Sequence, residues 1–220
     1  MDNNKKQSII TLDSIISLID VCFEQGTETV KTYLSSDDFA DMCEIAKDVG
    51  SDLSTTIKMF SLIKKSFSIP DKWFMKKLER YCQGLIDIPL EKRKKYLKKV
   101  GKESLNKDSV FILGVINKIE ELSKIDMLLK ILEAKISNII DDVMYRRLSL
   151  LVDKTMYSDL LYLKNNITEN CIKINSDEEE GLLSSGWLIF AGIGIGSATE
   201  EGGNLYQYSN VAKKFCELIQ

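Results

Sequence analysis

Near its C-terminus the chain reads DEEEGLLSSGWLIFAGIGIG over residues 177–196 and YQYSNVAKKF over residues 206–215. The four leading acids predict the start of a short helix, because negative charge stabilises a helix N-terminus. The glycine-spaced run 188–196 predicts a strand, and a Gly-rich turn and a second strand at Tyr206 to Tyr208 follow before a last helix. This order predicts a small winged-helix-like α+β module with one β-hairpin over residues 166–220.

The rest of the chain shows the pattern of a helical protein. Twelve Gly and only two Pro in 220 residues, with 29% charged residues, indicate a mainly α fold. Apolar residues recur at helical spacing in successive windows. These windows predict helices at 12–23, 39–49, 53–63, 71–86, 90–102, 106–119, 125–136 and 139–152, with caps at Asn106 and Ser123. We therefore expect a multi-helix bundle over residues 10–165, preceded by a disordered lead at 1–9.

Charge is unevenly distributed along the chain. The formal net charge is -3, but residues 71–107 carry 12 basic and 5 acidic side chains, whereas residues 169–220 carry 3 and 8. The helix expected at 90–102 is the most basic element. Its candidate anion-binding residues are Lys92, Arg93, Lys95, Lys98, Lys99 and Lys102. Such a cluster could neutralise several phosphates of a nucleic acid. We favour a solvated helix face, because Lys outnumbers Arg and Tyr96 is the only aromatic residue among the cations.

The sequence argues against most catalytic and metal sites. It contains no histidine, which excludes Ser-His-Asp and Cys-His nucleophiles and His-containing metal sites. Its five cysteines are scattered without the close spacing of a zinc site and are odd in number, so we expect reduced, buried thiols. We therefore expect no catalytic residues, no metal and no cofactor.

Two further patterns resemble sites but have a simpler interpretation. Adjacent acids at 177–180 and 141–142 point in different directions on a helix, so they predict solvated helix starts. Gly192, Gly194 and Gly196 lack the following helix and the lysine of a phosphate-binding loop. They predict a flat strand in which Ile193 and Ile195 face the core.

The residues Trp187, Leu188, Ile189 and Phe190 are the candidate protein interface. They would form an exposed apolar patch if the bundle leaves them uncovered, and such patches mark contact surfaces. The four acids that open the preceding helix oppose docking of this module onto DNA. We therefore expect the C-terminal module to serve protein contacts or self-association.

Spaced apolar and basic positions also carry a family resemblance over residues 71–219. They lie at 74–78, 89–93, 126–130, 145–148 and 159–163, and at Tyr206, Tyr208, Ser209 and Ala212. They resemble a family of uncharacterised bacterial and prophage-borne helical proteins that end in a winged-helix-like closure. The resemblance implies mobile-element or host-defence settings and no known activity. Ala212 stands where the family often has Gly, and residues 1–70 are not matched.

Together these observations predict a non-enzymatic interaction or regulatory protein that acts through protein contacts. The alternative is a nucleic-acid-binding regulator that uses the basic helix 90–102. The polar N-terminus lacks a signal-peptide pattern, and no run reaches the about 18 apolar residues of a membrane span. We expect a cytoplasmic location, and no small-molecule substrate is implied.

Overall fold

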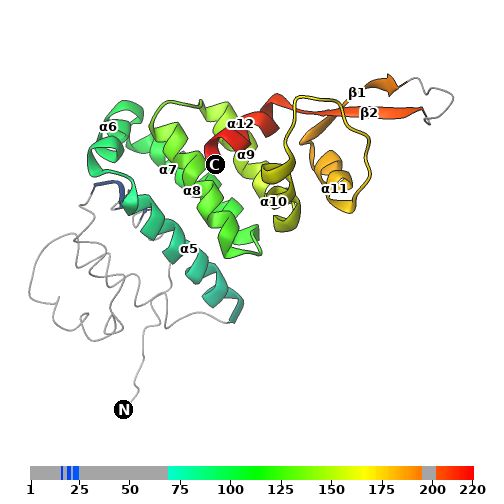
Figure 1. Ribbon diagram of the computed structural model, residues 1–220. Coiled ribbons are helices and arrows are strands. Elements are labelled where there is room, and N and C mark those ends of the chain that lie inside the picture. Colours follow the sequence, from blue (N-terminus) through cyan, green and yellow to red (C-terminus); the bar gives the residue numbers. More distant parts are fainter. Residues whose placement is uncertain (1–15, 17–18, 21, 25–68, 195–201) are drawn as a thin grey trace, which may run out of the picture. The chain divides into compact units, whose positions relative to one another are not determined.

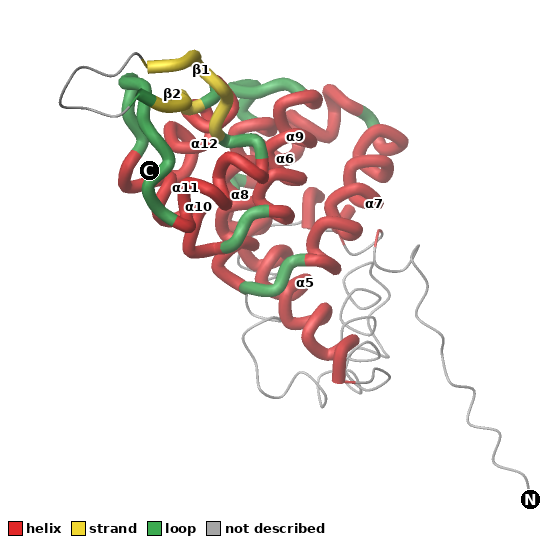
Figure 2. Tube along the Cα trace, turned by 90° about the vertical axis from the view of Figure 1, so that its right-hand side faces the viewer, coloured by secondary structure: helices red, strands yellow, loops and turns green. Residues whose placement is uncertain are grey.

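The computed structural model describes residues 16, 19–20, 22–24, 69–194 and 202–220 of the chain. These residues are mainly helical, with one antiparallel hairpin near the C-terminus (Figure 1, Figure 2), which confirms the predicted mainly α fold with a small C-terminal hairpin module. The winged-helix-like character of that module stays a prediction. The elements are α5 (Ile69–Asp87), α6 (Leu90–Val100), α7 (Lys102–Lys118), α8 (Leu122–Ile136), α9 (Asp142–Lys154), α10 (Tyr157–Asn166), α11 (Asp177–Ser185), β1 (Leu188–Gly194), β2 (Gly203–Tyr208) and α12 (Asn210–Ile219). The helices expected at 39–49 and 53–63 and the lead at 1–9 lie outside the described residues.

The chain divides into two compact units, Met1–Asn117 and Lys118–Gln220. The first contains α5, α6 and nearly all of α7, and the second contains α8 to α12 with both strands. The C-terminal hairpin thus belongs to the same unit as α8, α9 and α10. The separate division predicted at residue 165, between bundle and module, stays a prediction.

In the first unit a single glycine, Gly101, separates α6 from α7, and the sequence pattern placed this boundary incorrectly. Gly101 has a φ of 78°, a conformation that favours glycine, and its N–H donates to the Leu97 carbonyl at 2.9 Å. α6 therefore ends at Val100, and Lys102 opens α7. The prediction of one helix over 90–102 was wrong at its last two residues, and the predicted cap at Asn106 lies inside α7.

In the second unit, α12 packs against α8, α9 and α10. Its first turn is capped by Ser209, whose hydroxyl accepts from the Ala212 N–H at 3.2 Å. Its last turn is closed by Lys130, whose ammonium donates to the Ile219 and Gln220 carbonyls at 3.1 and 3.0 Å. The expected cap at Ser123 was wrong, because α8 begins at Leu122 and no side chain caps it.

The hairpin pairs β1 and β2 antiparallel, with Leu188 opposite Tyr208 and Phe190 opposite Tyr206. The register shifts between Phe190 and Gly192, so Ala191 is the extra residue of a β-bulge. Ile172 forms an isolated bridge to Tyr206, so β2 has a neighbour on both sides there. No helix lies between α10 and α11, which are joined by residues 167–176, longer than the three- or four-residue turn of a helix-turn-helix.

Candidate functional site

The C-terminal hairpin carries apolar side chains from the core of the second unit to its surface. Side chains opposite each other in an antiparallel pair share a face, and alternate residues of β2 return to that face. Leu188 and Tyr208 begin this face and are buried. Phe190 with Tyr206, and then Ile193 with Asn204, continue it outward. The hairpin extends beyond α11 and α12 (Figure 1), so neither of these two helices covers its outer part.

Trp187 and Leu188 are buried, which corrects their assignment to an exposed patch. The Trp187 indole N–H donates to the Thr155 hydroxyl at 2.7 Å, and its ring lies 4.8 Å from that of Phe215. Gly186, in the left-handed conformation, ends α11 and lets the Trp187 N–H return to the Leu182 carbonyl at 2.9 Å. This turn directs the indole into the core, so Trp187 anchors the hairpin and is not an interface residue.

The exposed part of the predicted patch is Ile189 and Phe190, and Ile193 joins them. Their exposed fractions are 44%, 58% and 72%. The expectation that Ile193 faces the core was wrong, because its place in the sheet lies beyond the covering helices; Ile195 lies outside the described residues. We call Phe190, Ile193 and Tyr206 the hairpin face, and Ile189 lies on the opposite side of the sheet.

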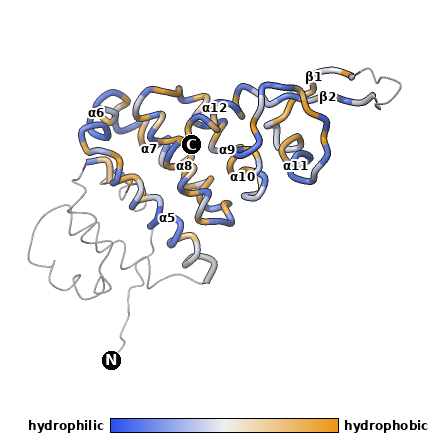
Figure 3. Tube along the Cα trace, viewed as in Figure 1, coloured by the Kyte–Doolittle hydropathy of each residue, from blue (hydrophilic) through white to orange (hydrophobic). Residues whose placement is uncertain are grey.

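The strands of the hairpin lack charged residues and proline, two of the features that usually protect a sheet edge. Their sequences are LIFAGIG in β1 and GNLYQY in β2. Among the described residues β1 pairs only with β2, so its outer edge is open, although the bulge at Ala191 interrupts its regularity. Gly192 has a φ of 146° and sits at this bulge. Gly192 and Gly194 lie in β1, as the strand prediction expected, and Gly196 lies outside the described residues. Figure 3 shows the contrast between apolar β1 and the polar α6.

The acidic start of α11 is only partly solvated. Glu179 is buried, and its carboxylate accepts from the Tyr162 hydroxyl at 2.8 Å and from the Asn175 N–H at 2.6 Å. The hydrogen bond to Glu179 raises the pKa of Tyr162 above its ordinary value. Glu179 therefore fastens α11 to α10, which corrects the expectation that all four acids are solvated. Asp177 and Glu180 are exposed, as expected.

The basic helix α6 presents most of its predicted cations to solvent. Lys92, Lys95, Lys98 and Lys99 are exposed, as is Lys94 between them. We call these five residues the lysine face. Lys102 is exposed too, but it belongs to α7 and lies 3.8 Å from the carboxylate of Asp20. It is therefore not part of the lysine face.

Arg93 is fully buried, which corrects its assignment to the anion-binding set. Its guanidinium donates to the Ile88 carbonyl at 2.8 Å, to the Ile86 carbonyl at 3.4 Å and to the Cys22 carbonyl. Burial lowers the pKa of Arg93 from its ordinary value. These backbone acceptors lie around the end of α5 and the start of α6, so Arg93 holds α6 from inside and does not reach a ligand.

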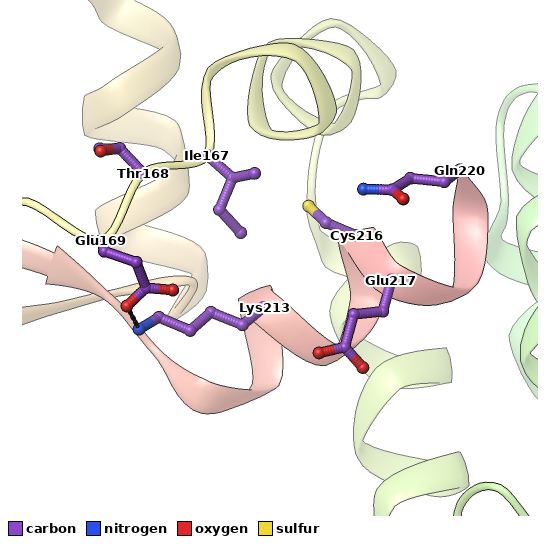
Figure 4. Close-up of a pocket in the computed structure, with 7 residues that line it drawn as sticks. All are labelled: Ile167, Thr168, Glu169, Lys213, Cys216, Glu217 and Gln220. Atoms are coloured by element: carbon purple, nitrogen blue, oxygen red, sulfur yellow. Dashed lines mark hydrogen bonds and ion pairs between the residues drawn. The ribbon is translucent and has the colours of Figure 1, made fainter.

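A small surface pocket lies beside α12 (Figure 4). Its volume is about 210 Å³, and Lys213 forms an ion pair with Glu169 at its wall. Cys216 also lines it, and burial raises the pKa of this thiol to about 11. The pocket therefore offers a cation already paired with a carboxylate and a thiol that stays protonated at neutral pH.

Two other thiols meet in the first unit. Cys22 and Cys82 are buried, and their mutual hydrogen bond, together with burial, raises the pKa of Cys82 well above its ordinary value. Their distance in sequence gave no sign of this contact. Within the described ranges, no three Cys, Asp or Glu side chains gather in a way that would hold a metal ion.

Comparison with known proteins adds no assignment: no family model, curated protein or solved structure matches the chain. In the part of the chain that the structure describes, no helix has the length and apolar character needed to cross a bilayer. The candidate binding surfaces among the described residues are the hairpin face and the lysine face.

Proposed function

We propose that this chain is a non-enzymatic interaction or regulatory protein that binds a protein partner through its C-terminal hairpin. The observation that carries the proposal is a hairpin whose two strands contain no charged residue and whose Phe190 and Ile193 are 58% and 72% exposed. Large exposed apolar groups on a soluble protein mark contact surfaces, and an open strand edge adds backbone donors and acceptors for an extended partner. The winged-helix-like character of the module is part of the same proposal.

The anchoring of the hairpin supports this function. A surface binds tightly when its contact residues are held in place before the partner arrives, because less conformational entropy is then lost. Trp187 fixes the base of the hairpin through Thr155 and Phe215, and Phe190 meets Tyr206 edge to face at 6.1 Å. The hairpin face thus consists of a pair of aromatic rings with an isoleucine beyond them. Aromatic residues are enriched in interface hot spots.

The absence of an enzymatic activity also remains a proposal. It is supported by the lack of histidine, by the high pKa of Cys216 and by the engagement of Glu179 with Tyr162 and Asn175. A cytoplasmic location and the mobile-element or host-defence setting implied by the family resemblance belong to this proposal too. Substrate turnover by the purified protein, abolished by changing a single acid, would contradict it.

The test compares two double variants with matched changes in apolar surface. Phe190→Ser with Ile193→Ser removes the two apolar side chains that β1 contributes to the hairpin face. Ile139→Ser with Val143→Ser removes residues that are 57% and 65% exposed near the start of α9. A protein captured from source-cell extract should be identified, purified and titrated against each form. We expect the hairpin variant to bind at least about a hundredfold more weakly, because it truncates two residues at about 2 kcal/mol each. The control should bind normally.

The same samples distinguish self-association from binding of another protein. Light scattering of the purified chain across a concentration series reports whether copies associate. Dimerisation that the hairpin variant abolishes would identify the protein partner as a second copy. Equal loss of binding in both variants, or a partner insensitive to both, would refute the assignment of the contact to the hairpin.

A further inference from the structure

We infer that the lysine face of α6 binds the phosphate backbone of double-stranded nucleic acid without reading its base sequence. This function is independent of the proposed hairpin contact and uses a different unit of the chain. It starts from the exposure of Lys92, Lys94, Lys95, Lys98 and Lys99 on one eleven-residue helix. Glu91, in the first turn, is the only acid on that helix.

The arrangement of the lysines follows from helical geometry. Residues three and four apart share a face, so Lys95 lies beside Lys98 and Lys99, and Lys94 lies beside Lys98. Four ammonium groups therefore gather over the last two turns of α6, within about 8 Å along the axis at 1.5 Å per residue. The helix C-terminus adds a partial negative charge that stabilises these cations in the unbound protein.

The helix that carries the lysines is held from inside. Arg93 binds three backbone carbonyls, and Tyr96, also buried, donates its hydroxyl to the Asp108 carboxylate at 3.4 Å. These contacts fix the rotation of α6 about its axis, so the lysine face points outward in one orientation. A fixed set of cations loses less entropy on binding a regular row of phosphates than a flexible segment would.

The chemistry of the surface favours a duplex phosphate backbone over a lipid surface or an unpaired strand. None of the large exposed apolar residues among the described ranges belongs to α6, so the helix has nothing to insert between lipid headgroups. Its one aromatic residue, Tyr96, is buried, so no ring is presented for stacking on unpaired bases. Lysine without arginine on the exposed face supplies flexible point charges and lacks the planar guanidinium fork, so the face favours contacts to phosphates.

The test uses fluorescence anisotropy of the full chain with labelled duplexes of two unrelated sequences. With four phosphate contacts, the slope of log affinity against log salt should be about -3.6, which is about a 150-fold loss between about 50 and 200 mM salt. Both duplexes should bind alike, and the matching single strand should bind no more tightly. Because the whole chain carries a net charge of -3, binding of this kind requires a local cationic surface.

The decisive comparison uses two variants of equal net charge. Changing Lys94, Lys95, Lys98 and Lys99 to Gln should abolish most of the slope and weaken binding at least about tenfold at about 50 mM salt. The control changes Lys107, Lys118, Lys154 and Lys164, which are exposed on other helices, to Gln and should bind like the wild type. Circular dichroism of both variants checks that they fold.

Several results would overturn the inference. One is the absence of duplex binding at about 50 mM salt, where electrostatic association is strongest. Another is an equal loss of duplex affinity in the lysine-face variant and in the control variant. Binding restricted to one of the two sequences would also contradict it, as would binding to phosphatidylserine vesicles with none to the duplexes. Hairpin variants should bind the duplexes normally, so failure of this inference is distinguishable from failure of the proposed hairpin contact.

Discussion

Replacing Gly181 by alanine is expected to destabilise the second unit, although the same change usually stabilises a helix. A Cβ at Gly181 would lie 2.2 Å from Oδ2 and 3.0 Å from Cγ of Asp159. Asp159 is buried in the first turn of α10, and its Oδ1 accepts from the Ser158 hydroxyl at 3.0 Å. The close packing of α10 and α11 therefore depends on the absence of a side chain at Gly181.

The magnitude follows from two opposing effects. Alanine in place of glycine stabilises a helix interior by about 1 kcal/mol. Overpacking costs about 1–3 kcal/mol, and the 2.2 Å separation places Gly181→Ala near the upper end, for a net loss of about 2 kcal/mol. In an Asp159→Ala background the overlap is absent, so Gly181→Ala should stabilise by about 1 kcal/mol. The double-mutant cycle should then give a coupling of about 3 kcal/mol.

The assay is denaturant unfolding followed by the fluorescence of Trp187. The chain has two tryptophans, so a Trp73→Phe background leaves Trp187, buried in the second unit, as the reporter. Gly114→Ala in α7 is the control, because no atom lies within 4 Å of its added Cβ; circular dichroism should show a gain of about 1 kcal/mol. A stabilising Gly181→Ala in the presence of Asp159 would refute the described packing.

Two further predictions concern buried groups. The Ser109 hydroxyl is buried without a hydrogen-bond partner, whereas the Ser149 hydroxyl donates to the Tyr145 carbonyl at 2.8 Å. Ser109→Ala should therefore be neutral or stabilising, and Ser149→Ala should cost about 1 kcal/mol of stability, as measured by thermal unfolding. Equal losses would contradict this difference. Burial raises the pKa of Cys216 from 9.0 to about 11 and that of Tyr208 from 10.0 to about 12, so the unfolded chain ionises first and stability should fall as pH rises through this range. Cys216→Ala should reduce the loss of stability between pH 9 and 11, measured by urea unfolding, whereas the control Cys171→Ala, at an exposed thiol, should not. An unchanged pH dependence of stability in Cys216→Ala would show that the thiol does not contribute.

Helix positions could be predicted from the sequence because helical periodicity is a local signal. The window expected at 71–86 falls within α5, and the one at 125–136 falls within α8. The start of α7 was missed because Gly101 alone separates it from α6, and glycine gives no polar side chain to mark the start of the new helix. The local sequence pattern thus located the helices but not the boundary between α6 and α7.

Burial could not be predicted as well, because it depends on what lies next to a residue in space. Trp187 and Phe190 belong to one uniformly apolar run, yet Trp187 is covered by Phe215 and Phe190 lies beyond the helices. For Arg93 a local signal was present. It occupies the apolar line of α6 with Leu90, Leu97 and Val100, at spacings of three, four and three, and its charge alone suggested a surface position.

The most direct test of the central claim is hydrogen exchange of the chain with and without its purified protein partner. If the hairpin is the contact, amides of β1 from Ile189 onward should exchange more slowly in the complex, because the partner covers the hairpin face and the open edge. Amides of α9 should keep their rates. Unchanged exchange throughout β1 and β2, with slowing confined to other elements, would contradict the account.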